Sequence, residues 1–152
     1  MAKAATTMTN VRQPWADAIT LRGKDVENRS YAIPRTHELP VWTLVVASKA
    51  PPPAPELAEY QRLTAEPAPG TFELASIVGA MEIVGCDQES DSKWYNGPGP
   101  DGKNHAWKIG RVVRFPTPCR GIQGCQTAFR RICTHPDAER ILAFLAEQAE
   151  CE

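Results

Sequence analysis

Leu21-Arg-Gly-Lys-Asp-Val-Glu-Asn-Arg-Ser-Tyr31 brings a lysine, a glutamate and an arginine together just after a glycine. In a regular strand Glu27 and Arg29 project from the same face. Lys24 is three residues before Glu27, so a perfect strand would turn its side chain away. Because Gly23 gives the backbone access to unusual dihedrals, the segment can curl and bring the Lys24 amine towards the same pocket. The stretch therefore predicts a small charged cluster at the edge of the core.

The residues before this stretch predict a short helix. Pro14 suits the first turn of a helix, and Trp15 and Ile19 recur at helical spacing. Gly23 suits the end of a helix, so we expect it to run from Pro14 to Arg22. A helix this short depends on packing. Trp15 and Ile19 are therefore expected in the core, and Trp15 can also wall one side of a cleft.

The rest of the chain mixes strand and helix signals. Val41–Ala47 is a continuous apolar run rich in β-branched residues, which predicts a strand buried on both faces. Met1–Asn10 shows no periodicity and is expected to be a disordered tail, followed by a single domain from residue 11 to residue 152. The other predicted elements are a helix at Glu56–Glu66, a strand at Ser76–Gly85, a strand at His105–Phe115, a turn at Pro116–Gly121, a returning strand at Ile122–Arg130, and a helix at Pro136–Gln148 with the apolar stripe Ile141, Leu142, Phe144 and Leu145. Short strands with scattered helices indicate an α+β domain whose sheet closes into a small mixed β-barrel.

Length and composition are those of an ordinary soluble domain. With 152 residues, of which 42% are hydrophobic and 23% charged, the chain is long enough for one sizeable core. No apolar run reaches the roughly 18 residues that span a bilayer, and the first residues lack the apolar block of a signal peptide. We therefore expect a cytoplasmic protein without a membrane partner.

The five cysteines are odd in number and form no C-x-x-C pair, which argues against a disulfide framework. Cys119, Cys125, Cys133 and His135 could ligate zinc in principle, but their spacing matches no common structural zinc pattern. We expect free thiols, and neither a metal nor a cofactor.

Charge is unevenly distributed along the chain, although the net charge is only −1. From Gly102 to Pro136 there is no Asp or Glu. The seven bases of this segment are Lys103, Lys108, Arg111, Arg114, Arg120, Arg130 and Arg131, and the remaining 10 bases and 18 acids leave the rest of the chain at −8. The asymmetry indicates either a basic face on an acidic body or a solvated set of strands that happens to be basic.

Two further features leave alternatives open. Trp94 and Tyr95 lie in a long polar loop from Asp87 to Lys103, where they can stack on exposed bases or pack on the barrel as a lid. Glu82 is a carboxylate within a predicted apolar strand. It either faces solvent on the alternate side of that strand or pairs with a cation such as Lys24 or Arg29.

The charged cluster carries a resemblance to a known family. Lys24-x-x-Glu27-x-Arg29 resembles the signature of the ASCH domain, which is named for activating signal cointegrator and belongs to the PUA-like β-barrel superfamily. Further matches are Gln13-Pro14-Trp15-Ala16, Ser30-Tyr31, Glu89-Ser90-Asp91-Ser92 and Trp107-Lys108-Ile109, and together they cover about Val11 to Phe129. The family usually places a glycine two residues before the lysine, where this chain has Arg22. The resemblance implies a PUA-like barrel with a cleft near the first helix.

ASCH and PUA-like domains are associated with RNA or DNA binding, so the resemblance implies a nucleic-acid-binding cleft lined by Lys24, Glu27 and Arg29. In such a cleft the two cations would meet phosphate or a base edge, while strand arginines track the backbone by charge. The expected nucleic-acid-binding residues are Lys24, Arg29, Trp94, Tyr95, Lys108, Arg111, Arg114 and Arg120. The expected partner is RNA, single-stranded DNA or a modified nucleoside. The alternative is a partly buried ion network that only holds the loop.

Some ASCH-like proteins are hydrolases, which gives a second hypothesis. They are described as ribonucleases, or as amidohydrolases that remove acyl groups from the exocyclic amine of modified cytidine. A lysine with a lowered pKa would serve as general base with a glutamate as its partner, so Lys24 and Glu27 would be the catalytic residues. The threonine of the amidohydrolase type is replaced here by Glu27. Tyr31 and His105 are further candidates for a ribonuclease. A domain that binds protein partners is the remaining possibility.

Overall fold

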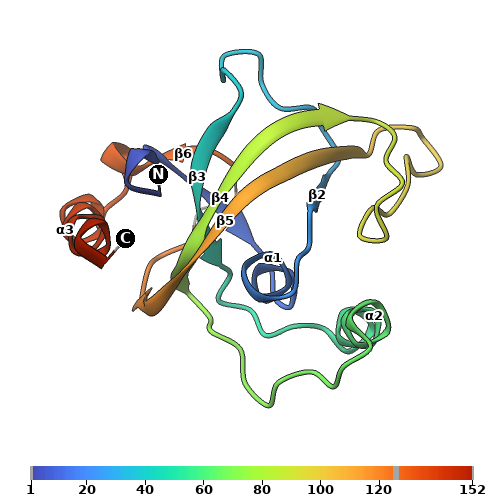
Figure 1. Ribbon diagram of the computed structural model, residues 1–152, viewed down its shortest axis with the longest axis horizontal. Coiled ribbons are helices and arrows are strands. Elements are labelled where there is room, and N and C mark those ends of the chain that lie inside the picture. The colour runs from blue at the N-terminus through green and yellow to red at the C-terminus, as the bar shows by residue number, and fades with distance from the viewer. Residues whose placement is uncertain (1, 125–126, 152) are drawn as a thin grey trace.

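The computed structural model describes residues 2–124 and 127–151. The elements in chain order are the 3₁₀ helix η1 (Ala2–Ala4), β1 (Thr7–Val11), α1 (Trp15–Leu21), β2 (Val26–Arg29), β3 (Val41–Ala47), α2 (Ala54–Thr64), β4 (Ser76–Asp87), β5 (His105–Arg120), β6 (Arg130–Arg131), the 3₁₀ helix η2 (Ile132–Thr134) and α3 (Ala138–Cys151). The strands form one curled, mixed sheet of six strands in the order β2-β5-β4-β3-β1-β6 (Figure 1). The predicted α+β class is confirmed, and the sheet has the shape of half a barrel. None of the helices in the described ranges has the length and apolar character that a membrane span needs.

The central strand β3 explains why its sequence is continuously apolar. Leu44 and Val46 point into a core cluster that also contains Ile141 of α3. Val45 points the other way, into a second cluster that contains Ile19 of α1. A strand covered on both faces needs apolar side chains at every position. The prediction for Val41–Ala47 is therefore confirmed in its bounds, and its residues from 43 onward are fully buried.

The first ten residues correct the sequence prediction. Instead of a disordered tail, Thr7–Val11 forms β1, which pairs in parallel with β3 inside the sheet. The hydroxyl groups of Thr7 and Thr9 lie 3.0 and 2.8 Å from the hydroxyl of Thr43 on β3. These hydrogen bonds allow polar side chains to be buried at this position. A short threonine-rich strand gives no apolar periodicity, so the sequence did not indicate it.

The long strand β5 also differs from the prediction. It continues through the expected turn at Pro116–Gly121, and Ile77↔Cys119 is still a register pair with β4. Pro116 and Pro118 are tolerated because β2 pairs with β5 only along His105–Lys108, so the far half of that edge needs no N–H donors. The expected strand Ile122–Arg130 is wrong as well: of its described residues only Arg130 lies in a strand, and residues 125 and 126 are outside the described ranges.

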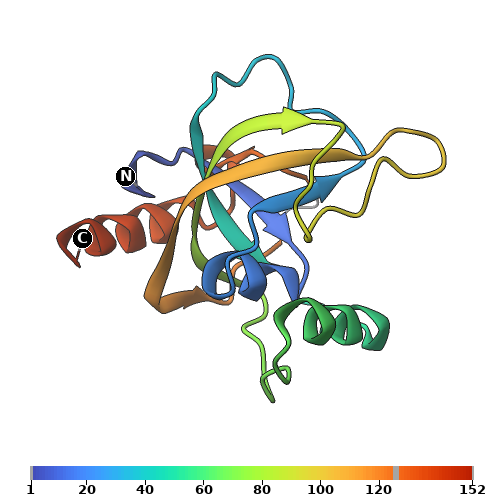
Figure 2. The same ribbon diagram turned by 45° about the vertical axis from the view of Figure 1, so that its right-hand side comes forward.

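Three helices pack around the curled sheet. The predicted C-terminal helix is confirmed as α3, although Leu142 of its expected apolar stripe is 54% exposed. The predicted helix at Glu56–Glu66 is confirmed as α2, which lies beside α1 (Figures 1 and 2) and whose Tyr60 joins a core cluster with Val26 of β2 and Ala106 of β5. Tyr60 joins the two helices, since its hydroxyl donates to Asp17 Oδ2 at 2.6 Å and accepts from Arg22 Nε at 3.0 Å. These contacts fix α2 against α1.

Candidate functional site

The Lys24 side chain is buried at the start of the charged stretch. Gly23 adopts a left-handed φ of +74°, and the turn lets the Lys24 N–H donate to the Ala18 carbonyl at 3.1 Å. The side chain then folds back, so that Nζ lies 3.4 Å from Glu27 Oε1 and donates to the Val26 carbonyl. Lys24 is 3% exposed. The curl expected at Gly23 is therefore confirmed.

Glu27 and Arg29 project together from β2, as the two-residue period of a strand requires. Arg29 Nη2 donates to Glu27 Oε2 at 2.9 Å and to the main-chain oxygen of Asn10 at 2.6 Å. The guanidinium also lies over the Trp107 ring, 5.5 Å from its centroid. The structure thus brings the three predicted groups together, with the carboxylate between the two cations.

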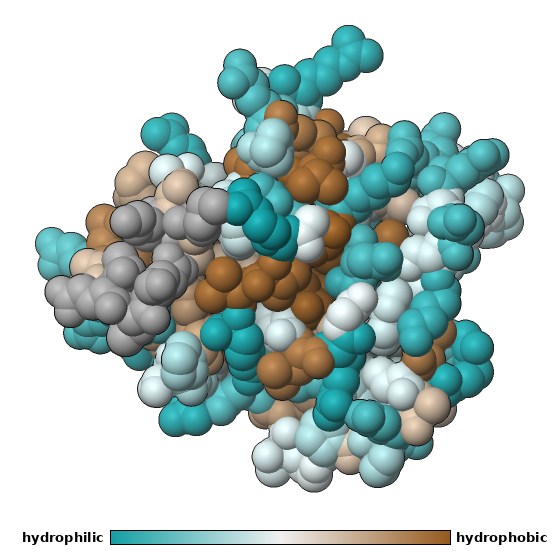
Figure 3. All heavy atoms as spheres, viewed as in Figure 1, coloured by the Kyte–Doolittle hydropathy of each residue, from teal (hydrophilic) through white to brown (hydrophobic). Residues whose placement is uncertain are grey.

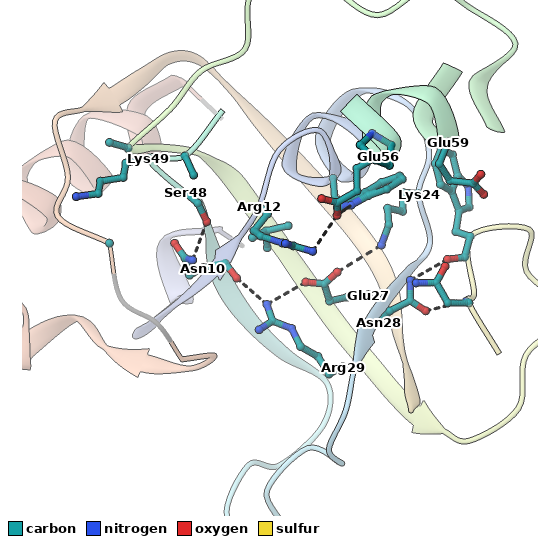
Figure 4. A pocket seen from close by; sticks show the side chains of 18 of the residues that line it. Asn10, Arg12, Lys24, Glu27, Asn28, Arg29, Ser48, Lys49, Glu56 and Glu59 are labelled. Carbon is teal, nitrogen blue, oxygen red and sulfur yellow. Dashed lines mark hydrogen bonds and ion pairs between the residues drawn. The ribbon is translucent and has the colours of Figure 1, made fainter. Parts of the chain in front are cut away.

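This cluster forms the floor of an open cavity of about 1130 Å³ (Figure 4). The α2 helix supplies one wall through Glu56, Glu59 and Leu63, and the loop at Trp94 closes one side. The segment 121–124 lies at the end next to Ser48. A volume of this size exceeds what a single side chain fills and lies just above the range of about 300–1,000 Å³ for small-molecule sites.

An aromatic wall stands beside the lysine. Trp15 Nε1 donates to Glu56 Oε1 at 2.9 Å, and Arg12 Nη2 donates to the same oxygen at 2.8 Å. The Trp15 ring centroid is 5.9 Å from Lys24 Nζ. Glu56 therefore fixes the orientation of a half-buried indole that faces the cavity. Trp15 serves both the core and the cleft, the two places expected from the sequence.

A line of contacts runs along the cavity floor and joins three strands. From Lys24 it passes through Glu27 and Arg29 to the main chain of Asn10, whose side-chain Nδ2 donates to Ser48 Oγ at 2.7 Å (Figure 4). The order of the groups along this line is amine, carboxylate, guanidinium, amide and hydroxyl. A ligand lying on it meets hydrogen-bond donors and acceptors in turn.

Burial changes the acid–base behaviour of the lysine. Desolvation lowers the pKa of Lys24, the charge and hydrogen bond of Glu27 oppose that decrease, and the nearby charge of Arg29 adds to it. The net direction is downward, so this amine gives up its proton more readily than an exposed lysine. It can donate hydrogen bonds as an ammonium or accept a proton as a neutral amine.

The predicted basic residues of β5 lie elsewhere and have partners. None of the four lines the cavity. The contacts are Lys108 Nζ with Asp87 Oδ2 at 2.8 Å, Arg111 Nη2 with Glu82 Oε2 at 2.7 Å, Arg120 Nη2 with Glu73 Oε1 at 2.7 Å, and Arg114 Nη1 with the Thr20 hydroxyl at 2.9 Å. Three of these cations are thus paired with carboxylates on or next to β4. The surface viewed in Figure 3 shows apolar area near its middle with hydrophilic side chains around it.

Of the two alternatives for Glu82, pairing with a cation is confirmed, but the cation is Arg111. Glu82 is 7% exposed, so it does not face solvent, and it pairs with Arg111 rather than with Lys24 or Arg29. The hydrogen bond from Arg111 holds the pKa of Glu82 below its usual value. Glu82 therefore lies outside the cavity and secures β4 to β5.

The two loop aromatics behave differently from each other. Trp94 is 4% exposed and packs against Val26 and Ala106. It also lines the cavity, on the side formed by its loop. Its main-chain oxygen accepts from Asn28 Nδ2 at 2.9 Å. Tyr95 does not line the cavity, and its hydroxyl donates to the Gln88 carbonyl and lies 3.3 Å from the Asn104 carbonyl. The packed-lid alternative describes Trp94, and neither ring stands free as a stacking platform.

The remaining candidates lie outside the cavity lining. Tyr31 packs edge-on against Trp107, and His105 Nδ1 lies 2.8 Å from the Lys103 carbonyl. Of the four residues considered as zinc ligands and set aside, Cys125 is outside the described ranges. In the part of the chain that the structure describes, no group of three or more His, Cys, Asp or Glu is placed to hold a metal ion.

Three residues of the site had no sequence signal. Asn10 lay in the expected tail, Ser48 follows a buried strand, and Glu56 follows a proline-rich spacer. Each reaches the cavity through strand pairing or helix docking between segments far apart in the sequence. The spacing within one stretch carries no information on such contacts.

Fold and site together define an α+β protein in which a curled sheet holds a charged, aromatic-walled cavity. Comparison with protein-family models and with curated proteins finds no match to this chain.

Proposed function

We propose that the protein binds single-stranded nucleic acid and that the cavity accepts one unpaired nucleotide. The observation that carries the proposal is the position of Lys24, Glu27 and Arg29 on the floor of an open cavity beside the Trp15 ring. Recognition of single-stranded nucleic acid typically places an unstacked base against an aromatic ring and reads its edge with hydrogen bonds.

Each part of the cavity has a counterpart in a nucleotide. Trp15 offers a flat apolar face for the base. Lys24 and Arg29 donate to base oxygen or ring nitrogen, and Glu27 accepts from an exocyclic amine. Glu27 contacts both cations and offsets one of their two charges, so the floor keeps a net charge of +1, and its donors and acceptor suit a hydrogen-bonding ring. The fold and this cluster also support the proposal that the protein is an ASCH-type member of the PUA-like barrels.

Phosphate contacts belong at the rim of the cavity in this proposal. Three of the four predicted cations of β5 are held by carboxylates, and Arg114 donates to the Thr20 hydroxyl. Lys49 lines the cavity and has no ion-pair or hydrogen-bond partner within residues 2–124 and 127–151, so it is available to an anion. Binding is therefore expected to depend on salt weakly, as for one or two phosphate contacts.

Fluorescence anisotropy with labelled single-stranded oligonucleotides tests the proposal. Lys24→Met keeps an unbranched apolar stem in the buried position and removes the amine, and we expect it to weaken binding by about tenfold or more, the effect of one charged hydrogen bond. Lys103→Ala, on an exposed loop outside the cavity lining, is the matched control and should bind like the wild type. Equal affinity of the wild type and Lys24→Met, or no binding by the folded wild type, would rule the proposal out.

A second candidate function is hydrolysis, favoured by the lowered pKa of the buried Lys24 amine. In an amidohydrolase the neutral amine would take a proton from the attacking water while the new C–O bond forms. Arg29 would stabilise the resulting oxyanion, and the proton would pass to the leaving amine as the C–N bond breaks. Incubating the protein with N4-acylated cytidine and with labelled RNA checks this function. Turnover that is lost in Lys24→Met supports it, and absence of turnover at high protein concentration removes it.

A further inference from the structure

The amine of Lys24 is a buried nitrogen that lines an open cavity and is held by two acceptors. Its Nζ donates to the Val26 carbonyl and lies 3.4 Å from Glu27 Oε1. Among the described residues Nζ has no third hydrogen-bond partner. An ammonium group has three N–H donors, whereas a neutral amine has two donors and a lone pair. Loss of one proton therefore breaks neither bond and leaves a lone pair without a protein partner.

The surroundings of the amine favour that loss. Burial has the largest effect on the pKa of Lys24 and lowers it. The Trp15 ring centroid lies 5.9 Å from Nζ, and Figure 4 shows the amine directed along the cavity floor towards Glu27. A desolvated lysine in a pocket is a nucleophile that forms imines with carbonyl compounds. The amine is thus equipped to attack a carbonyl carbon that enters the cavity.

Nucleic acid exposes such a carbonyl where a nucleotide has lost its base. The ring of the remaining sugar opens, and its C1′ becomes an aldehyde. In the proposed binding mode the base of an intact nucleotide lies against Trp15 with its edge at Lys24 and Glu27. When the base is missing, that space is left to C1′. We propose that Lys24 forms an imine with the C1′ aldehyde of an abasic nucleotide held in the cavity, an inference that rests on the proposed binding of single-stranded nucleic acid.

The groups on the cavity floor balance this reaction. The lone pair of Nζ attacks C1′, so a C–N bond forms while the electron pair of the C=O double bond moves to the oxygen. Glu27 Oε1, 3.4 Å from Nζ, carries the two protons of the nitrogen in turn to that oxygen. The oxygen leaves as water when the C=N bond forms. The products are one imine and one water molecule, and no electrons are gained or lost.

Reductive trapping tests the inference with the wild-type chain. The probe is a single-stranded DNA oligonucleotide with one abasic site, and sodium cyanoborohydride reduces the imine to a stable secondary amine. The adduct blocks tryptic cleavage after Lys24, so after nuclease digestion the modified peptide spans residues 23–29. We expect labelling of Lys24 to exceed that of the exposed Lys103 by about tenfold or more, because binding holds the aldehyde beside the amine.

Two variants and a second probe locate the reaction. Lys24→Met should lose the adduct, and Lys103→Met, on an exposed loop outside the cavity lining, should keep it. Both are compared at saturating oligonucleotide, which is verified by the anisotropy of a strand that carries an unreactive tetrahydrofuran at the abasic position. Free 2-deoxyribose 5-phosphate carries the same aldehyde without the strand. It should label Lys24 about tenfold less at equal concentration, and equal labelling overturns the assignment to nucleic acid.

The remaining outcomes separate this inference from the proposed function. If the wild type binds the intact and tetrahydrofuran strands but gives no adduct on Lys24, or labels Lys24 and Lys103 equally, the inference is overturned and nucleic-acid binding stands. An adduct on Lys24 without binding of the intact strand removes the proposed function and supports the aldehyde reaction. Neither binding nor an adduct overturns both.

Discussion

Replacing Glu27 with glutamine removes the anion that lies between Lys24 and Arg29. The Glu27 side chain is 8% exposed, and its oxygens lie 3.4 Å from Lys24 Nζ and 2.9 Å from Arg29 Nη2. The amide keeps the shape but leaves two cations close together with little water. Removing one partner of a buried ion pair costs about 3–5 kcal/mol. Because Lys24 can respond by losing its proton, we expect the lower end of this range, a loss of about 3 kcal/mol in the free energy of unfolding at pH 7. For a chain of this length that loss lowers Tm by roughly 6–12 °C.

The stability lost in Glu27→Gln should depend on pH in a defined direction. Burial lowers the pKa of Lys24 and Glu27 opposes that decrease, so the pKa of Lys24 falls further in Glu27→Gln. Between that folded pKa and the ordinary lysine value of about 10.4, the unfolded chain binds more protons than the folded protein. Stability therefore rises with pH across this window, and it begins to rise at a lower pH in the variant. The difference in the free energy of unfolding between wild type and Glu27→Gln should therefore become smaller from pH 7 to pH 9.5.

Urea unfolding followed by tryptophan fluorescence measures this difference at both pH values. Glu59→Gln is the matched control, because Glu59 lies on the wall of the same cavity but is 42% exposed and pairs with the exposed Arg62. It should change stability little at either pH. If Glu27→Gln is as stable as the wild type at pH 7, or if the difference widens at pH 9.5, the charge balance described for the cavity floor is wrong.

Three further predictions concern the rim, the sheet and the α2 wall. Lys49→Ala should reduce the slope of log affinity against log salt by about one charge, measured by anisotropy titrations at several salt concentrations, whereas Lys103→Ala should not. Gly79→Ala should destabilise the fold by about 1–3 kcal/mol or more, because its Cβ would lie 2.2 Å from the Val113 carbonyl oxygen; thermal unfolding that matches the wild type would contradict this. Tyr60→Phe removes the hydroxyl that joins α2 to α1, so it should lower the free energy of unfolding by about 1–2 kcal/mol and speed proteolysis within residues 50–70. Unchanged cleavage would show that other contacts hold α2.

The core of the site was predictable because it lies within six residues of chain. Lys24, Glu27 and Arg29 are placed by one glycine turn and one short strand, both of which have local sequence signals. The helix before them has similar signals. Local backbone geometry was therefore enough to predict that these side chains lie close together, without knowing the rest of the fold.

The contacts that complete the site depend on register between distant segments. Asn10 is brought to Ser48 by the parallel pairing of β1 with β3, and β1 itself is stabilised by threonine hydroxyl bonds to Thr43. A buried threonine on a strand looks polar in sequence, and only its partner shows that it belongs in the core. For this reason the sequence predicted neither the strand β1 nor the position of its residue Asn10 in the cavity.

The basic segment shows why composition alone overstates a charged face. Its cations follow one another along β5, but the carboxylates that pair with them, Glu73, Glu82 and Asp87, lie on or next to β4. The antiparallel pairing of β4 with β5 brings the two sets together. A count of charges in one segment cannot include acids that the sheet places beside it, so it missed that three of the seven bases form ion pairs with carboxylates on or next to β4.

The opening in the sheet accounts for both the position and the chemistry of the cavity. In a closed barrel the facing edges of β2 and β1 would exchange main-chain hydrogen bonds. Here those strands are not neighbours, and the Arg29 side chain reaches the Asn10 main-chain oxygen in place of a ladder bond. The contact that replaces the ladder bond therefore lies at the floor of the cavity, where the Glu27 and Arg29 side chains line a space that can hold a ligand. A half-barrel closed by side chains thus supplies a binding site at the place where its strand pairing stops.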